Sequence, residues 1–383
     1  MEREKRSSNF ELLRIAAMLM IIMFHMVQHV IYRQMTNWTY MAYYDNGLFN
    51  NPVIYKQLYI PAVMTPLGLV GNGLFIMISG YFTASNSKLN AAKVGKKLLE
   101  QMACVSLLLM VGSAVLFKRM NSELLELIPV TIFQTDWWFV GYYFCVLLIA
   151  AFFLNRRVVQ LDQEKYSAFL VILLAAVQFG WSGNLADNLA SGLRILLNGV
   201  FLYYLGGYIH RYNPFQKVRG YVLVLLIAAS YFLVLLNYHN ITLSNIEKYL
   251  QQGSADTFLQ SAVYFDNFSI VVTIHAVALF EIFRRIRIPH SRLINFIGGA
   301  TFMIYLLHEN TLVHSLWNMQ DWITVLYNKP VLFLGQFMLV TVATFVLGTL
   351  IYCGYLGLKW MLRHFRWIFV KESGTELSEQ KTI

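Results

Sequence analysis

Apolar runs about twenty residues long recur along the entire chain, and they constrain its fold more than any other feature. About 20 apolar residues is the length an α-helix needs to cross the hydrocarbon core of a bilayer. The 383 residues are 57% hydrophobic and 13% charged, whereas an ordinary soluble domain has about 25% charged residues. We therefore expect an all-α, polytopic membrane protein whose backbone groups are bonded within its helices.

The apolar runs predict ten transmembrane helices, which puts both chain ends on one side. They lie at about 10–32, 62–84, 98–117, 136–154, 166–181, 193–210, 220–237, 263–283, 293–316 and 331–358. The fifth and sixth are the least defined, because polar residues 182–191 also fit a re-entrant pair. We expect residues 1–363 to form one integral-membrane domain and 364–383 a short polar cytoplasmic tail.

Cationic residues gather in alternate connections. With Arg14 set aside, 22 lysines and arginines fall in the N-terminal segment, the even-numbered connections and the C-terminal region, against seven elsewhere. Lysine and arginine accumulate in cytoplasmic loops of membrane proteins, so both termini are predicted to be cytoplasmic. The same rule accounts for the net charge of +10, which gives no reason to expect a nucleic-acid partner.

The first span, residues 10–32, carries Arg14 and His25 in an otherwise apolar run. Eleven residues are about three helical turns, so the two side chains share nearly one face, about 16 Å apart. An ionisable group inside a membrane helix marks a functional site by default. The alternatives are an arginine that snorkels to the headgroups and a histidine that is hydrogen-bonded structurally.

Two further local patterns concern helix geometry. Ser8 and Glu11 have the spacing of a capping box, which predicts that the first helix starts near Asn9. The second span is rich in helix-perturbing residues, which indicates either a bent helix or a close helix–helix contact. These residues are Pro61, Pro66, Gly68, Gly71, Asn72, Gly73 and Gly80.

An arginine, ten residues and a histidine in the first membrane helix resemble the signature of the integral-membrane acyltransferase 3 family. Later segments are similar to landmarks of members that O-acetylate surface polysaccharides: GNGLFIMISGYF, DWWFVGYYFCVLL, FLYYLGGYIHRYN and ATFMIYLLHENTLVHSLW. The resemblance implies an O-acyltransferase of the cell (plasma or inner) membrane. It would move an acyl group, usually acetyl from acetyl-CoA, to a sugar hydroxyl of an exported polysaccharide or its lipid-linked precursor.

The catalytic residues implied by the resemblance are His25 as general base, with Arg14, His308 and Glu309. For His308, a role in positioning the acceptor and a structural role as a helix partner are the alternatives. Imidazole takes and returns a proton near neutral pH. His25 lies about 22 Å and His308 about 20 Å from the inner ends of their helices, so the two rings are expected to meet. Neighbouring residues on a helix point about 100° apart, so Glu309 cannot share the face of His308, and one of the two is expected to turn toward a different helix.

Cationic residues near the inner end of the first and third spans suit the phosphates of CoA, although the positive-inside rule alone would also place lysines there. The predicted donor-binding residues are Arg14, Lys93, Lys96, Lys97 and Ser79. Many family members have arginines in the loop after the second span, whereas this chain has lysines there. Lysines cannot form the bidentate contacts that arginines make with phosphates. Acetyl-CoA is expected as a co-substrate, with no bound cofactor and no metal; the three cysteines lack metal-type spacing.

The predicted acceptor-binding residues are Trp138, Tyr142, Asn310 and Arg194. The aromatic residues could stack on a sugar, or they could belong to an interfacial belt, which is the interpretation favoured for Trp137. Arg194 also fits an interfacial anchor. Four other histidines are interpreted as structural: His29, His210, His275 and His314.

Two other functions fit parts of the pattern. Ten spans with a glycine- and proline-interrupted helix are compatible with a carrier or flippase of a lipid-linked sugar, although the sequence contains no internal repeat. A structural or sensing protein would tolerate substitution of both Arg14 and His25. The sequence does not specify the sugar, its hydroxyl, the acyl chain or the oligomeric state.

Overall fold

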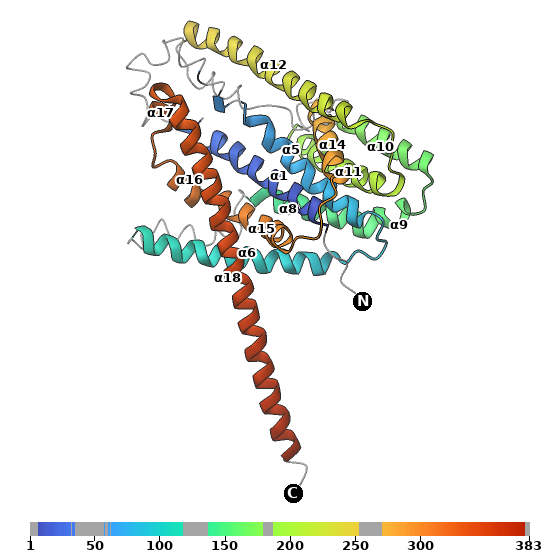
Figure 1. Ribbon diagram of the computed structural model, residues 1–383. Coiled ribbons are helices and arrows are strands. Elements are labelled where there is room, and N and C mark those ends of the chain that lie inside the picture. Colours follow the sequence, from blue (N-terminus) through green and yellow to red (C-terminus); the bar gives the residue numbers. More distant parts are fainter. Residues whose placement is uncertain are drawn as a thin grey trace.

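The computed structural model describes residues 7–31, 33–34, 57, 60–61, 63–117, 137–178, 187–252 and 270–379. These residues form helices and the turns between them, and no strand occurs among them (Figure 1). The all-α prediction is confirmed. The helices are α1 (Ser8–Met26), η1 (Val27–Ile31), α5 (Thr65–Thr83), α6 (Ala91–Phe117), α8 (Trp138–Ile149), η5 (Ala150–Leu154), α9 (Asn155–Val158), α10 (Gln163–Gln178), α11 (Asp187–Tyr212), α12 (Gly220–Gln252), α14 (Ile270–Arg285), α15 (Arg292–His308), α16 (Thr311–Trp317), α17 (Trp322–Asn328) and α18 (Pro330–Glu379).

Each of the ten predicted segments contains a helix. Within the described residues, three helical stretches are long and apolar enough to cross a membrane: Ser8–Ile31, Trp138–Val158 and Pro330–Leu362. Two shorter apolar stretches are Leu67–Thr83 and Gly220–Leu236. These apolar helices indicate that the chain is a membrane protein. Part of the polar segment 182–191 is helical, because α11 starts at Asp187, and residues 179–186 lie outside the described part.

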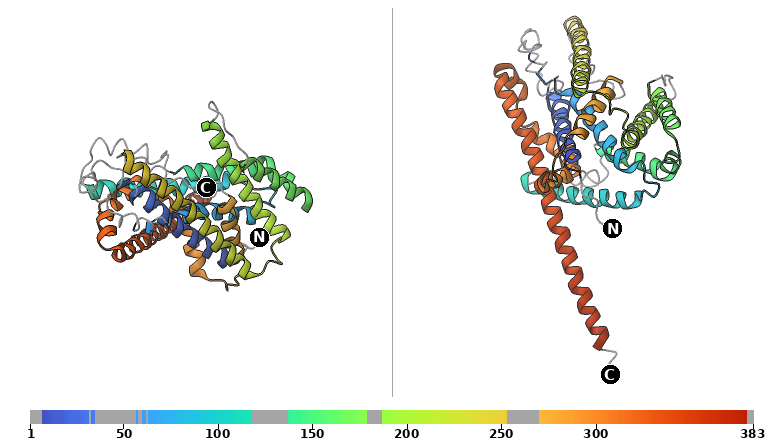
Figure 2. Two further views of the ribbon diagram at one scale, coloured as in Figure 1. Left: turned by 90° about the horizontal axis from the view of Figure 1, so that it is seen from above. Right: turned by 45° about the vertical axis from the view of Figure 1, so that its right-hand side comes forward.

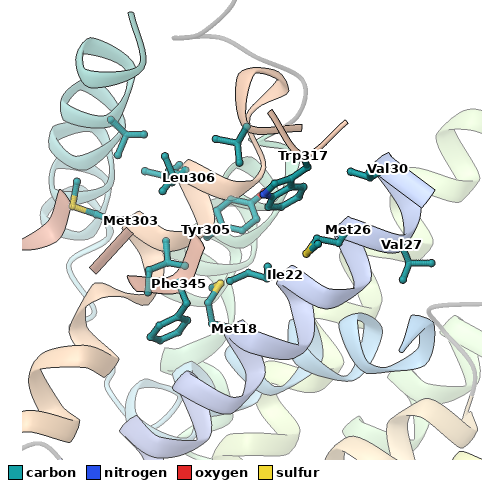
Figure 3. Close-up of a cluster of buried hydrophobic side chains, with 14 of the residues drawn as sticks. Met18, Ile22, Met26, Val27, Val30, Met303, Tyr305, Leu306, Trp317 and Phe345 are labelled. Carbon is teal, nitrogen blue, oxygen red and sulfur yellow. The ribbon is translucent and has the colours of Figure 1, made fainter. Parts of the chain in front are cut away.

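Helix α1 lies in the centre of the body, with α12 along one side and α6 along the opposite side (Figures 1 and 2). It packs against α5 and α15 and separates two apolar cores. Met18, Ile22 and Met26 of α1 belong to the first core, together with Tyr305 and Trp317 (Figure 3). The second core lies among α1, α5, α8, α10, α11 and α14.

The glycines of α5 allow close helix packing, and the helix runs uninterrupted over Thr65–Thr83. A Cβ on Gly71 would press on the Ile21 side chain and on the Ala17 carbonyl of α1. A Cβ on Gly80 would fall on the Tyr203 carbonyl of α11. Of the two interpretations of this segment, close helix–helix contact is therefore the one the structure supports.

Helices α1 and α15 run parallel. At their starts, the Ser8 hydroxyl donates to Asn295 Oδ1 at 3.0 Å and accepts from the Ser291 backbone N–H at 2.9 Å. The capping-box prediction is wrong, because the N-cap residue is Ser7 and its side chain makes no capping bond. Ser8 instead fixes the register of the two helices, and Glu11 pairs with Arg14.

The ninth predicted span is not one helix. Helix α15 ends at His308, and Asn310 starts α16 by accepting a hydrogen bond from the Leu312 N–H at 2.9 Å. A side-chain amide that caps a new helix satisfies a donor that the break would otherwise leave free. The prediction of continuous helix over 293–316 is wrong at this point, and the break lies at Glu309.

The last helix extends well beyond the body (Figures 1 and 2). Its N-terminal half packs on α15, α17, α1 and α6. The predicted tenth span, 331–358, lies within α18, which continues past residue 363 without interruption. The proposed boundary between membrane domain and tail therefore falls inside a helix.

Candidate active site

Three buried side chains from two helices meet at one point. His25 Nδ1 lies 2.9 Å from His308 Nε2 and 2.5 Å from Glu309 Oε2. The two imidazoles are stacked, with ring centroids 5.1 Å apart. All three residues are at most 5% exposed. The expected meeting of His25 and His308 is confirmed.

The hydrogen bonds assign the proton on each ring. His308 Nδ1 lies 2.8 Å from the Ile304 carbonyl, which can only accept, so His308 carries its hydrogen on Nδ1. Its Nε2 is then an acceptor. His25 Nδ1 therefore carries the hydrogen of the bond between the two rings, and Glu309 Oε2 lies beside this nitrogen as a close charge contact. The lone pair of neutral His25 is thereby placed on Nε2, the nitrogen that is available as a base.

The helix break allows Glu309 to join this group. Glu309 is the C-cap of α15, with φ −83° and ψ 9°, so its side chain does not follow the helical progression from His308. The prediction that Glu309 and His308 turn to different helices is wrong, since both contact His25. A carboxylate placed beside an imidazole nitrogen is a recurring arrangement in acid–base catalysis.

A cavity of about 240 Å³ lies between α1, α5, α6, α8 and α15. The predicted donor residues Arg14, Ser79 and Lys97 line it, as do Asn72 and Tyr143. In contrast, Lys93 and Lys96 are exposed residues of α6 and do not line it.

The cavity leads toward the histidine pair. On α1 it is lined by Arg14, Met18 and Ile21, and the next position on this face is His25. On α15 its last lining residue is Tyr305, three positions before His308. The imidazoles therefore follow the lined stretch by about one helical turn, roughly 5 Å. Tyr305 packs edge-on against His308, with ring centroids 5.6 Å apart.

A sequence profile of the acyltransferase 3 domain family matches residues 7–353. The chain belongs to this family of acyltransferases. Neither a search of curated proteins nor one of solved structures returned a match. The matched range contains the histidine pair, Glu309 and the cavity. The apolar helices and the family membership together identify the protein as a membrane acyltransferase.

Two polar contacts at the acyltransferase cavity were not predicted from the sequence. Arg14 Nη1 lies 2.5 Å from the buried Glu11 Oε1. The i, i+3 spacing of these residues was a visible signal for this pair. Ser79 Oγ donates to the Phe75 carbonyl at 3.0 Å and lies 3.0 Å from the Tyr143 hydroxyl. The Ser79–Tyr143 bond joins α5 to α8, and no sequence spacing could reveal it.

The predicted acceptor residues are dispersed in the acyltransferase. Trp138 and Tyr142 line a second cavity of about 60 Å³ between α5, α8, α11 and α14. Asn72 lines both cavities. Asn310 caps α16. Arg194 Nε donates to the Val177 carbonyl near the end of α10, at 2.7 Å.

The remaining aromatic and histidine predictions have mixed outcomes. The belt interpretation of Trp137 is wrong, because it is 3% exposed and its Nε1–H donates to the Leu306 carbonyl at 3.0 Å. The structural interpretation fits His275, which lies 3.0 Å from the Ser230 hydroxyl. His29 and His314 instead stack on one another close to Glu309, with ring centroids 4.4 Å apart.

Proposed function

We propose that the protein transfers an acetyl group from acetyl-CoA to a sugar hydroxyl of an exported polysaccharide or of its lipid-linked precursor. The observation that carries the proposal is His25, whose proton is assigned to Nδ1 and which follows a cavity lined by Arg14 and Lys97. A base at one end and cations along the wall suit acyl transfer from a donor that carries phosphates.

In the proposed reaction, the acceptor oxygen attacks the thioester carbonyl carbon while His25 Nε2 takes the hydroxyl proton. The C–S bond then breaks, and the departing CoA thiolate recovers that proton from His25. Glu309 holds the imidazole through Nδ1 and offsets the positive charge that the ring gains in between. The low exposure of His25 keeps water, a competing acceptor, away from the thioester.

The proposed arrangement in the cell follows the charge pattern of the loops. Ten transmembrane helices with both termini in the cytoplasm would place Arg14 and Lys97 on the donor side of the plasma (inner) membrane. Acetyl-CoA would enter there, with its phosphates at the cationic residues and its thioester directed up the cavity. The acceptor sugar would arrive from the opposite side or from the lipid.

An acceptor-dependent assay tests this function. The purified full-length protein is incubated with acetyl-CoA labelled in the acetyl group, with and without de-O-acetylated polysaccharide. We expect free CoA and ester-linked label to appear in equal amounts, and only when acceptor is present. A carrier or flippase would move sugar without releasing CoA, so transport without CoA release would contradict the proposal.

A further inference from the structure

A second histidine pair lies beside the proposed catalytic one. His29 of η1 is about one helical turn beyond His25, and His314 belongs to α16. Their rings are nearly parallel, 11° apart. One donor atom each of His29, Glu309 and His314 lies within 4.8 Å of the other two. Three potential ligands from three separate elements therefore converge.

His314 is an unsatisfied member of this group. The residue is 4% exposed, and its Nε2 has no hydrogen-bond partner among the described residues. Burial of a polar nitrogen without a partner destabilises the folded protein, so such a group requires an explanation. His29 is only partly buried, which gives the group a side open to an incoming ligand.

The neighbouring triple, His25, His308 and Glu309, also satisfies the distance condition for a metal site. Three of its four ring nitrogens are, however, already engaged: His308 Nδ1 with the Ile304 carbonyl, and His308 Nε2 with His25 Nδ1. A cation there would have to displace these bonds. At His314 it would instead supply the missing partner.

We propose that His29, Glu309 and His314 bind a divalent transition-metal ion, with Zn²⁺ the best fit. Two imidazoles and one carboxylate are a recurring ligand set for zinc, which accepts water in its remaining positions. Metal–ligand bonds of about 2.0–2.1 Å in a tetrahedron require donor atoms about 3.3 Å apart. The donor atoms lie within 4.8 Å of one another, so side-chain rotations would have to bring them closer by up to about 1.5 Å.

The site would connect η1, the α15–α16 break and α16 through one ion. Glu309 has two carboxylate oxygens, so it can hold His25 with one and the cation with the other. The cation would thereby act as a positioning element for Glu309. No sequence motif predicts this site, because His29 lies 280 positions before Glu309. The inference does not depend on which acyl donor or acceptor the enzyme uses.

Metal content of the purified full-length protein tests the proposal. The wild type is loaded with ZnCl₂, desalted and analysed by elemental mass spectrometry. We expect about one equivalent of Zn²⁺ per chain and a Zn²⁺-dependent rise in the melting temperature. His29→Ala and His314→Ala should lose both, whereas His210→Ala, a histidine far along the chain on α11, should lose neither. Wild-type protein that retains no Zn²⁺ after loading would overturn the proposal.

Two further variants separate coordination from folding and from the neighbouring triple. His314→Cys supplies a different zinc ligand, so it should bind Zn²⁺ where His314→Ala does not. His308→Ala should retain the ion, because His308 belongs only to the other triple. Loss of Zn²⁺ in His308→Ala with retention in His314→Ala would place the metal at the other triple and refute the assignment. Equal Zn²⁺ content in His314→Ala and the wild type would refute it as well.

Discussion

At the scale of single residues, the proton assignment of His25 depends on a chain of three contacts. The Ile304 carbonyl fixes the tautomer of His308, and His308 together with Glu309 fixes that of His25. The nitrogen left with a lone pair is therefore determined by backbone and carboxylate oxygens on α15. Glu309 carries the negative charge that stabilises a protonated His25.

Glu309→Gln tests this dependence. The amide can still approach His25, but it has lost the charge that stabilises the imidazolium form. We expect kcat for acetyl transfer to fall by about 10²–10⁴-fold, the range attributed to general acid–base catalysis, with KM for acetyl-CoA nearly unchanged. Steady-state kinetics on the purified variant give both values. An unchanged kcat would remove Glu309 from the mechanism.

A second residue-scale prediction concerns the donor cations. Lys97 lines the cavity, whereas Lys165 is an exposed residue in the first turn of α10 and pairs with Asp162 at 2.8 Å. Lys97→Ala should raise KM for acetyl-CoA by about 3–30-fold, because one charge-assisted contact with a phosphate is lost. Lys165→Ala should leave KM unchanged. Similar KM values for both variants would contradict the proposed donor position.

At the scale of helices, the close contact of α5 with α11 depends on residues without side chains. Gly80 lies against the Tyr203 carbonyl, whereas the nearest atom to a Cβ on Gly73 would be Leu202 Cδ1 at 3.5 Å, an ordinary contact. Gly80→Ala should therefore force the helices apart and destabilise the protein by about 1–3 kcal/mol. Gly73→Ala should have little effect. Thermal unfolding in detergent measures the difference, and equal melting temperatures would contradict the packing described.

The break between α15 and α16 gives a second prediction at this scale. If Asn310 acts as a helix cap, Asn310→Ser should retain stability and activity, because serine also caps well. Asn310→Ala should lose about 1 kcal/mol of stability. Melting temperatures and acetyl transfer for the pair provide the measurement. Loss of activity in the stable serine variant would favour the direct acceptor contact predicted from the sequence.

At the scale of the whole molecule, much of the helical layout was predictable. A chain that crosses a bilayer must form its backbone hydrogen bonds within helices of apolar residues, and such runs are visible in the sequence. The pairing of His25 with His308 was also accessible, since helix direction and residue rise determine depth. The role of Glu309 was not predictable, because it depends on a helix break. The residue that caps the new helix, Asn310, cannot be told from other polar residues by the sequence alone. The convergence of His29 with His314 depends on tertiary packing that no local pattern encodes.

The proposed topology is testable on the intact protein. Reporter domains fused to the N-terminus and to the C-terminus should both report a cytoplasmic location, because the cation-rich connections include both ends. A reporter fused in the cation-poor connection after the first span, residues 33–60, should report the opposite side. Chain ends on different sides would exclude ten spans and would require a new assignment of the donor side.

The central claim is that His25 is the base for acetyl transfer. The most direct measurement compares the O-acetyl content of the surface polysaccharide in cells that express wild type, His25→Ala or His210→Ala at equal membrane abundance. His210 is exposed and contacts the Tyr81 ring, away from both cavities. We predict that the ester is lost with His25→Ala and retained with His210→Ala. Normal acetylation by an abundant His25→Ala protein would contradict the account.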